Sequence, residues 1–234
     1  MKSLPLHDLA EQNISIKDEL NTALKQVVDS GSFIRGENVS SFENNFANYL
    51  SIDHCIGVGN ATDGLHIALQ ALELPTGSEI IIPANAHVAP ALAALNNNLK
   101  PVFADVDFSR MLINADSIRK QITPNTKVVV AVHLYGLVCP MQELSDLCNE
   151  HDLILLEDFS QAQGADSNGI KVGSYGRINV CSFYPTKPLG ALGDGGAITT
   201  SDPELMHKCR ALANYGSLIR NNSEMAGRNS RLDE

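Results

Sequence analysis

Apolar residues along this chain follow two patterns, helical spacing and short continuous runs. From Ile16 to Val28 they recur every three or four positions, which predicts a helix that ends near Ser30-Gly31. Further along, short apolar runs stand between segments of helical spacing, as is typical of buried strands separated by helices. The pattern predicts helices over 39–49, 61–72, 88–95, 141–151 and 203–215, and strands over 54–59, 79–83, 101–106, 127–134, 153–157, 179–183 and 196–200.

This alternation indicates an α/β fold with a mainly parallel sheet and helices on both faces. In such sheets ligands bind beyond the carboxyl ends of the strands. At the end of the chain, Gly216 to Glu234 is polar and contains glycine, so we expect a connection there and not a closing element.

Composition narrows the classes of function. The chain has 234 residues, 44% hydrophobic and 19% charged, which is ordinary for a soluble globular protein. Its formal net charge of −10 argues against a nucleic-acid partner. Neither a signal peptide nor a long apolar run is present, so we expect a cytoplasmic protein with no membrane span. The five cysteines are scattered, which predicts free, mostly buried thiols, with Cys181 in the core.

Two charged residues that follow predicted strands could carry chemistry. Asp158 comes after the run Leu153-Ile-Leu-Leu, and Lys187 ends the segment Ser182-Phe-Tyr-Pro-Thr-Lys187. A lysine amine can capture an aldehyde, and a carboxylate beside a pyridine nitrogen keeps that ring protonated. Singly, Asp158 is better explained as a helix cap or ion-pair partner, and Lys187 as a solvated loop cation. Together they are equally consistent with a pyridoxal phosphate site.

A phosphate site is indicated between the strand at 54–59 and the next helix. The segment Gly59-Asn60-Ala61-Thr62-Asp63 places backbone N–H groups at a helix start, where they attract anions. Thr62 or Asp63 can also cap that helix. The hydroxyl of Ser182 could add a further donor to the phosphate. No His/Cys/Asp group has metal-ligand spacing, so we expect no metal.

Two histidines and a glycine pair have less specific meanings. His87 begins an apolar helix, where its ring is either a hydrogen-bonded core group or a surface that stacks on a cofactor ring. His133 ends a predicted strand, and a structural role is favoured over a catalytic one. Asp194-Gly195-Gly196 predicts a tight hairpin turn after the lysine segment.

Several segments together resemble the DegT/StrS-type sugar aminotransferases. These are fold type I enzymes that depend on pyridoxal 5'-phosphate and act on nucleotide-linked keto sugars. The resemblance runs in order along almost the whole chain and implies the large domain of that fold. It rests on residues 59–65, 157–164, 182–187, 192–197 and 229–234.

The resemblance implies a role for each matching residue. Lys187 forms the Schiff base with the cofactor and shuttles protons, Asp158 pairs with the pyridine nitrogen, and Gln161 hydrogen-bonds the phenolic oxygen of the ring. The phosphate is held by the N–H groups of Ala61 and Thr62 together with Ser182. His87 takes the place of the residue that stacks on the ring. Asn229 reaches the phosphate of the neighbouring subunit. The role of Asn229 implies a homodimer with shared active sites.

The chain departs from the family pattern at Pro90, Pro188 and Phe159, none of which is a reacting group. Family members also continue beyond the Arg-Leu-Asp-Glu motif into a small C-terminal domain that helps to close the site. The resemblance therefore implies an N-terminal arm and helix over 1–30, a cofactor-binding large domain over 31–216, and the start of a connection to the absent small domain over 217–234.

The expected activity is transfer of an amino group from an amino acid, with glutamate as the donor, to the keto group of a nucleotide-linked deoxy sugar. Residues 132–141 are most similar to members that act on dTDP-3-keto-6-deoxyhexoses. Two alternatives stay open. One is a catalytically silent fragment or regulator of the same fold. The other is a family dehydratase, although such members lack the lysine that this chain has at Lys187.

Overall fold

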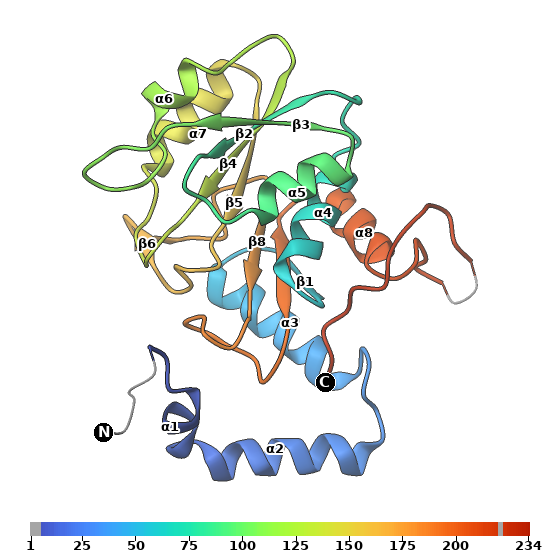
Figure 1. Ribbon diagram of the computed structural model, residues 1–234. Coiled ribbons are helices and arrows are strands. Elements are labelled where there is room, and N and C mark those ends of the chain that lie inside the picture. The colour runs from blue at the N-terminus through green and yellow to red at the C-terminus, as the bar shows by residue number, and fades with distance from the viewer. Residues whose placement is uncertain (1–5, 220–221) are drawn as a thin grey trace.

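The computed structural model describes residues 6–219 and 222–234. A seven-stranded sheet in the order β1-β9-β8-β5-β4-β2-β3 forms its centre (Figure 1). Its strands are β1 (His54–Val58), β2 (Glu79–Pro83), β3 (Lys100–Ala104), β4 (Thr126–Val132), β5 (Ile154–Asp158), β8 (Ile178–Ser182) and β9 (Gly196–Thr200). Strand β9 is antiparallel to β8 and β1, and every other pairing is parallel. The mainly parallel sheet is therefore confirmed.

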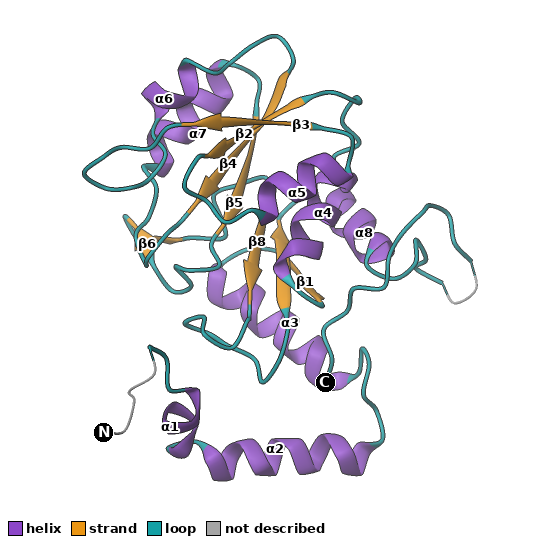
Figure 2. Ribbon diagram, in the orientation of Figure 1, coloured by secondary structure: helices purple, strands orange, loops and turns teal. Residues whose placement is uncertain are grey.

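A small hairpin and most of the helices lie around this sheet, whereas the two N-terminal helices lie apart from it (Figure 2). The helices are α1 (Leu9–Ile14), α2 (Lys17–Ser30), α3 (Glu37–Leu50), α4 (Ala61–Ala71), α5 (Ala89–Asn96), α6 (Ala115–Arg119), α7 (Met141–Glu150) and α8 (Pro203–Leu212), and the hairpin pairs β6 (Asp166–Ser167) with β7 (Ile170–Lys171). Each predicted helix and strand is present with small shifts at its ends. The short elements α1, α6, β6 and β7 were not predicted, because so few residues show no clear periodicity.

Helices cover both faces of the sheet, as two neighbouring residues of one strand show. Val180 of β8 belongs to the cluster that contains the apolar residues of α4, whereas its neighbour Cys181 belongs to the cluster with Phe46 of α3. Because successive strand residues point to opposite faces, α4 and α3 cover opposite sides. The expected two-sided cover is confirmed.

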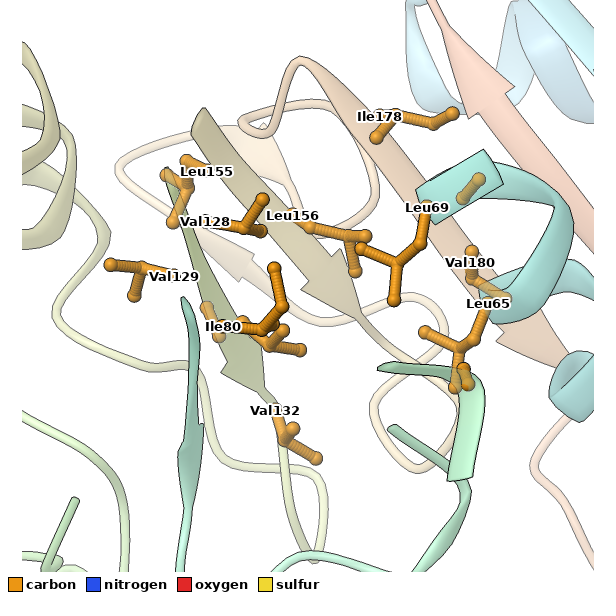
Figure 3. Packing of buried hydrophobic residues seen from close by; sticks show 14 of the residues in the cluster. Leu65, Leu69, Ile80, Val128, Val129, Val132, Leu155, Leu156, Ile178 and Val180 are labelled. Carbon is orange, nitrogen blue, oxygen red and sulfur yellow. The ribbon is translucent and has the colours of Figure 1, made fainter. Parts of the chain in front are cut away.

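The buried face of α4 fixes that helix on the sheet. Leu65 and Leu69 lie against the strand residues Leu156, Ile178 and Val180 (Figure 3). Each of these side chains is almost fully buried, and burial of one such side chain stabilises the fold by about 1.5–3 kcal/mol. The packing directs the N-terminus of α4 towards the carboxyl ends of the parallel strands.

The described chain differs from two local expectations. The side chain that caps α4 is Asn60, which accepts a hydrogen bond from the Asp63 N–H at 2.8 Å, and not Thr62 or Asp63. Asn60 has the extended backbone of a cap position, whereas the other two are already helical. No tight turn forms at 194–196: Gly196 starts β9, and the long segment 183–195 joins it to β8.

All five cysteines are free and buried, as predicted. Cys181 is fully buried in the cluster beneath α3, so its predicted place in the core is confirmed. Burial raises the pKa of Cys148 to about 12, and it raises the pKa of Cys181 as well. These thiols stay protonated at neutral pH, which makes them poor nucleophiles.

The last described residues return to the body of the domain near the start of α3. The Glu234 carboxylate accepts hydrogen bonds from the backbone N–H groups of Gly36 at 2.6 Å, Asn38 at 2.9 Å and Val39 at 3.2 Å. Nearby, the Ser230 hydroxyl accepts from the Gly59 N–H at 3.0 Å. A distant carboxylate thus satisfies the free donors at a helix start.

We expect Glu234→Gln to lower the free energy of unfolding by about 1 kcal/mol at pH 7, as the loss of a helix cap does. Burial alone would raise the pKa of Glu234, but the backbone N–H donors of Val39, Asn38 and Gly36 outweigh it and hold the pKa below its ordinary value. The stabilisation is therefore complete above the unfolded-state pKa and is lost as the pH falls through the lowered folded-state pKa.

Urea unfolding of wild type and Glu234→Gln at pH 7 and at pH 3 measures this difference. It should shrink at the lower pH to the extent that the wild-type carboxyl becomes protonated. Glu143→Gln, on the exposed surface of α7, is the matched control. An equal difference at both pH values would show that the charge of Glu234 does not stabilise α3.

Candidate active site

A cavity of about 320 Å³ lies where the carboxyl ends of three parallel strands meet the start of α4. Val132 of β4 pairs with Asp158 of β5, and Asp158 pairs with Val180 of β8, two residues before Ser182. These strand residues therefore lie on the face that α4 covers. The lining residues are Asn60, Ala61, Thr62, Leu65, His87, Ala89, Val132, His133, Leu134, Asp158, Ser160, Gln161, Ser182, Tyr184, Lys187 and Asp194.

The structure brings together all the predicted site residues except Asn229. Asn229 forms a backbone bridge with Asn214 after α8, its side chain is exposed, and it does not line the cavity. Its predicted contact is with a second subunit, so its role stays a prediction. Lys187 and Asp158, the two residues on which the chemistry depends, line the same cavity.

Asp158 is held firmly at the end of β5. One carboxylate oxygen, Oδ1, accepts the Ser160 N–H at 3.1 Å, and the backbone carbonyl accepts the His133 N–H at 2.9 Å. The residue is only 8% exposed. Within residues 6–219 and 222–234, the other oxygen, Oδ2, has no hydrogen-bond donor, so it is available to a group in the cavity.

Lys187 lies on the segment 183–195 that connects β8 to β9. Its backbone N–H donates to the Tyr184 carbonyl at 2.8 Å, which turns the chain at the lysine. The side chain is half-buried, and no carboxylate of the described chain forms an ion pair with it. Its amine is therefore not engaged by a carboxylate of the described chain.

The start of α4 presents donors to an anion. Among the described residues the N–H groups of Ala61 and Thr62 have no acceptor, whereas the Asp63 N–H is used by the Asn60 cap. Gly196 lets β9 approach closely, because a Cβ there would meet the Ala61 nitrogen at 2.9 Å. Ser182 Oγ accepts the Tyr184 N–H at 3.0 Å, so its own hydrogen can point elsewhere.

Two further cavity residues have one polar group engaged and another free. Gln161 Oε1 accepts the Tyr135 N–H at 3.1 Å, which leaves its NH₂ group as the free donor. His87 lies just before α5, is exposed, and accepts the Ala89 N–H through Nδ1 at 3.2 Å. The bond orients the imidazole ring beside the cavity.

A buried hydrogen-bond network beneath Asp158 was not predicted from the sequence. The Glu157 carboxylate accepts from the N–H groups of Gly173, Tyr175 and Gly176 at 2.6–2.9 Å and lies 3.0 Å from His133 Nε2. His133 Nδ1 accepts the Cys139 N–H at 3.0 Å. Both side chains are fully buried, so this histidine has a structural place next to the strand end.

We expect Glu157→Gln to lower the free energy of unfolding by about 2–3 kcal/mol, since its NH₂ group would face buried N–H donors and leave them unsatisfied. Chemical denaturation at pH 7 measures the loss. Glu204→Gln, exposed in the first turn of α8, is the control and should change stability little. Equal stability of wild type and Glu157→Gln would contradict the importance of this network.

The cavity has the groups that pyridoxal phosphate requires. A free lysine amine, a carboxylate with an available oxygen, an amide donor and an anion-binding helix start surround one space. The residues present therefore fit this cofactor. A nucleotide-phosphate loop would instead need a glycine-rich pattern that this helix start lacks.

Comparison with known proteins agrees with this geometry. A model of the DegT/DnrJ/EryC1/StrS aminotransferase family matches residues 14–234. The chain belongs to this family. It is 40% identical over 232 residues to a UDP-N-acetyl-3-dehydro-alpha-D-glucosamine 3-aminotransferase of Acidithiobacillus ferrooxidans, covering 99% of this chain and 63% of the relative.

Two other relatives carry different names. A "pleiotropic regulatory protein" of Geobacillus stearothermophilus is 40% identical, with 99% of this chain and 62% of the relative covered. A dTDP-3-amino-3,4,6-trideoxy-alpha-D-glucose transaminase of Streptomyces venezuelae is 38% identical, with 99% and 61% covered. The chain thus spans about three fifths of the length of these relatives.

Solved structures show the same fold. S. venezuelae DesV superposes with a TM-score of 0.96 at 37% identity, over 100% of this chain and 63% of DesV. NtdA from Bacillus subtilis, with its bound cofactor PMP, gives 0.91 at 33% identity, over 100% and 54%. The fold type I large domain is therefore confirmed, and so is the cofactor, because the family depends on pyridoxal phosphate.

The described residues also bear on membrane spans and metal sites. Among residues 6–219 and 222–234, no helix is both long and apolar enough to cross a bilayer. The same part of the chain contains no group of three or more His, Cys, Asp or Glu side chains that could hold a metal ion.

Proposed function

We propose that the protein is a pyridoxal-phosphate-dependent aminotransferase that moves an amino group from an amino acid, with glutamate as donor, to the keto group of a nucleotide-linked deoxy sugar. The observation that carries this proposal is the placement of Lys187 and Asp158 on one cavity with the start of α4. Family membership supports it, because the family is one of aminotransferases.

Bound pyridoxal phosphate supplies an aldehyde that a lysine amine can capture with loss of water, and a protonated ring that withdraws electrons from the carbon next to the amino nitrogen. Lys187 would provide that amine and would move protons through Nζ. Asp158 would hold the proton on the ring nitrogen through its available oxygen. Gln161 orients the ring through its amide NH₂ group.

The remaining cavity residues would hold the phosphate and the ring face. N–H groups of Ala61 and Thr62, with the Ser182 hydroxyl, form an anion site at the positive end of the helix. His87 places a flat ring beside the cavity and would stack on the cofactor. These roles rest on the position of each residue and on the family resemblance.

The sugar proposed is a dTDP-3-keto-6-deoxyhexose. The S. venezuelae relative is named for a dTDP-linked sugar, the A. ferrooxidans relative for a UDP-linked one, and both names put the amino group at carbon 3.

We further propose a cytoplasmic homodimer in which Asn229 reaches the phosphate of the second subunit. The division at residues 30 and 216, with a small domain after 234, belongs to the same proposal.

Transfer of ¹⁵N from labelled glutamate to a dTDP-3-keto-6-deoxyhexose tests the function. The expected product is a sugar with ¹⁵N at carbon 3. A silent fragment or regulator, which the name of the Geobacillus relative favours, would leave the sugar unlabelled. A dehydratase would remove a hydroxyl group and incorporate no nitrogen, and either result would overturn the proposal.

A further inference from the structure

We propose that Gln163 is a positioning residue for Lys187: its side-chain amide anchors the lysine segment at two points and so sets where the reactive amine lies. The inference rests on the proposed function, in which Lys187 captures the aldehyde of the cofactor. Gln163 lies outside the cavity and lines a separate, more apolar groove with Phe42 and Leu189, so it does not act on the cofactor directly.

The amide of Gln163 makes hydrogen bonds on both sides of the lysine. Its Nε2 donates to the Ser182 carbonyl at 2.8 Å, before the lysine, and more weakly to the Leu189 carbonyl at 3.4 Å, after it. Its Oε1 accepts the Leu189 N–H at 2.7 Å. One planar group therefore joins the end of β8 to the residue two positions past Lys187.

Among the described residues, one other side chain from outside 182–195 hydrogen-bonds the backbone of this segment: the Ser160 hydroxyl accepts the Ser182 N–H at 3.0 Å, at the end of β8 and five residues before Lys187. The segment otherwise bonds to itself: the Phe183 N–H donates to the Gly195 carbonyl at 2.8 Å, and the Ala191 N–H donates to the Phe183 carbonyl at 2.7 Å. These bonds close the base of the loop. They leave its tip, with Lys187, fixed to the rest of the domain mainly through Gln163.

The anchor also couples the lysine to the wall of the cavity. Gln163 follows Gln161, which lines the cavity and accepts the Tyr135 N–H, on the segment that begins at Asp158. The residues that hold the ring and the residue that holds the lysine loop therefore belong to one short stretch of chain. A shift of about 1 Å in a reacting group can lower a rate by as much as 10²-fold, so such an anchor has a measurable effect.

The test compares two forms of the cofactor. Pyridoxal phosphate would bind with a covalent link to Lys187, whereas pyridoxamine phosphate has no aldehyde and would bind without one. We expect Gln163→Met, which keeps the size of the side chain and removes its hydrogen bonds, to weaken pyridoxal phosphate binding about tenfold, as the loss of one net hydrogen bond does. Affinity for pyridoxamine phosphate should stay within about twofold of wild type.

Gln142→Met, on the exposed surface of α7, is the matched control and should leave both affinities unchanged. Gln163→Glu is a second variant, and it replaces Gln163→Met if that protein does not fold. It keeps the acceptor for the Leu189 N–H and loses the donor to Ser182, so it should weaken pyridoxal phosphate selectively too.

Three results would overturn the inference. Equal weakening of both cofactor forms would show that Gln163 only supports the fold, and no weakening of either would show that it does not anchor the lysine. In both cases the proposed function stands if the wild-type protein binds pyridoxal phosphate tightly and borohydride traps the cofactor on Lys187. A wild type that binds pyridoxal phosphate without a link to Lys187 would instead overturn the proposed function and the inference with it.

Discussion

Lys187→Ala is expected to abolish the covalent link to pyridoxal phosphate and to lower the rate of amino transfer by at least ~10³-fold, because the variant lacks both the amine that captures the aldehyde and the group that moves protons. The visible absorbance of the linked cofactor should disappear. Pyridoxamine phosphate should still bind, since the start of α4, Asp158 and Gln161 remain in place.

Lys120→Ala is the control for this variant. Lys120 is exposed after α6, does not line the cavity, and its loss should change neither the absorbance nor the rate. The assay combines an absorbance spectrum, a binding curve for each cofactor form and the ¹⁵N transfer. An unchanged spectrum and rate in Lys187→Ala would mean that another amine captures the cofactor.

Asp158→Asn is expected to lower the rate of amino transfer by on the order of 10²–10³-fold, the size of effect seen when one preorganised electrostatic partner is removed from an active site. The amide cannot keep a proton on the ring nitrogen as a carboxylate does, so the ring withdraws electrons less well. Its oxygen can still accept the Ser160 N–H, so the strand end should keep its shape.

A variant that still binds the cofactor but transfers the amino group slowly would identify the role of Asp158. Asp158→Asn should retain the covalent link to the cofactor while transfer becomes slow, and Asp53→Asn, exposed just before β1, should behave as wild type. Circular dichroism and the unfolding midpoint would confirm that the variant is folded. Full activity in Asp158→Asn would place the ring nitrogen elsewhere in the cavity.

Periodicity was sufficient to predict the sheet and its main helices. Buried strands such as β2 and β4 are continuous apolar runs, and helices such as α3 have clear apolar spacing, so each is visible in its own residues. Ligands bind beyond the carboxyl ends of strands in parallel sheets, and this rule predicted that Asp158 would lie where a ligand binds.

Features that depend on neighbours in space were not predictable in this way. Glu157 and His133 are far apart in the chain and meet only because β4 and β5 pair. Gln163 looks like an ordinary polar residue until the segment 183–195 folds against it. The cap of α4 was assigned to Thr62 or Asp63 because the sequence does not show at which residue the backbone becomes helical.

Peptide mapping after borohydride reduction tests directly whether Lys187 is the residue that captures the cofactor. Wild-type protein is mixed with pyridoxal phosphate, reduced, digested and analysed by mass spectrometry for lysines that carry the cofactor. We expect a single modified site, Lys187, and a much smaller yield when pyridoxamine phosphate occupies the cavity first. Modification of a different lysine, or scattered modification that pyridoxamine phosphate does not prevent, would contradict it.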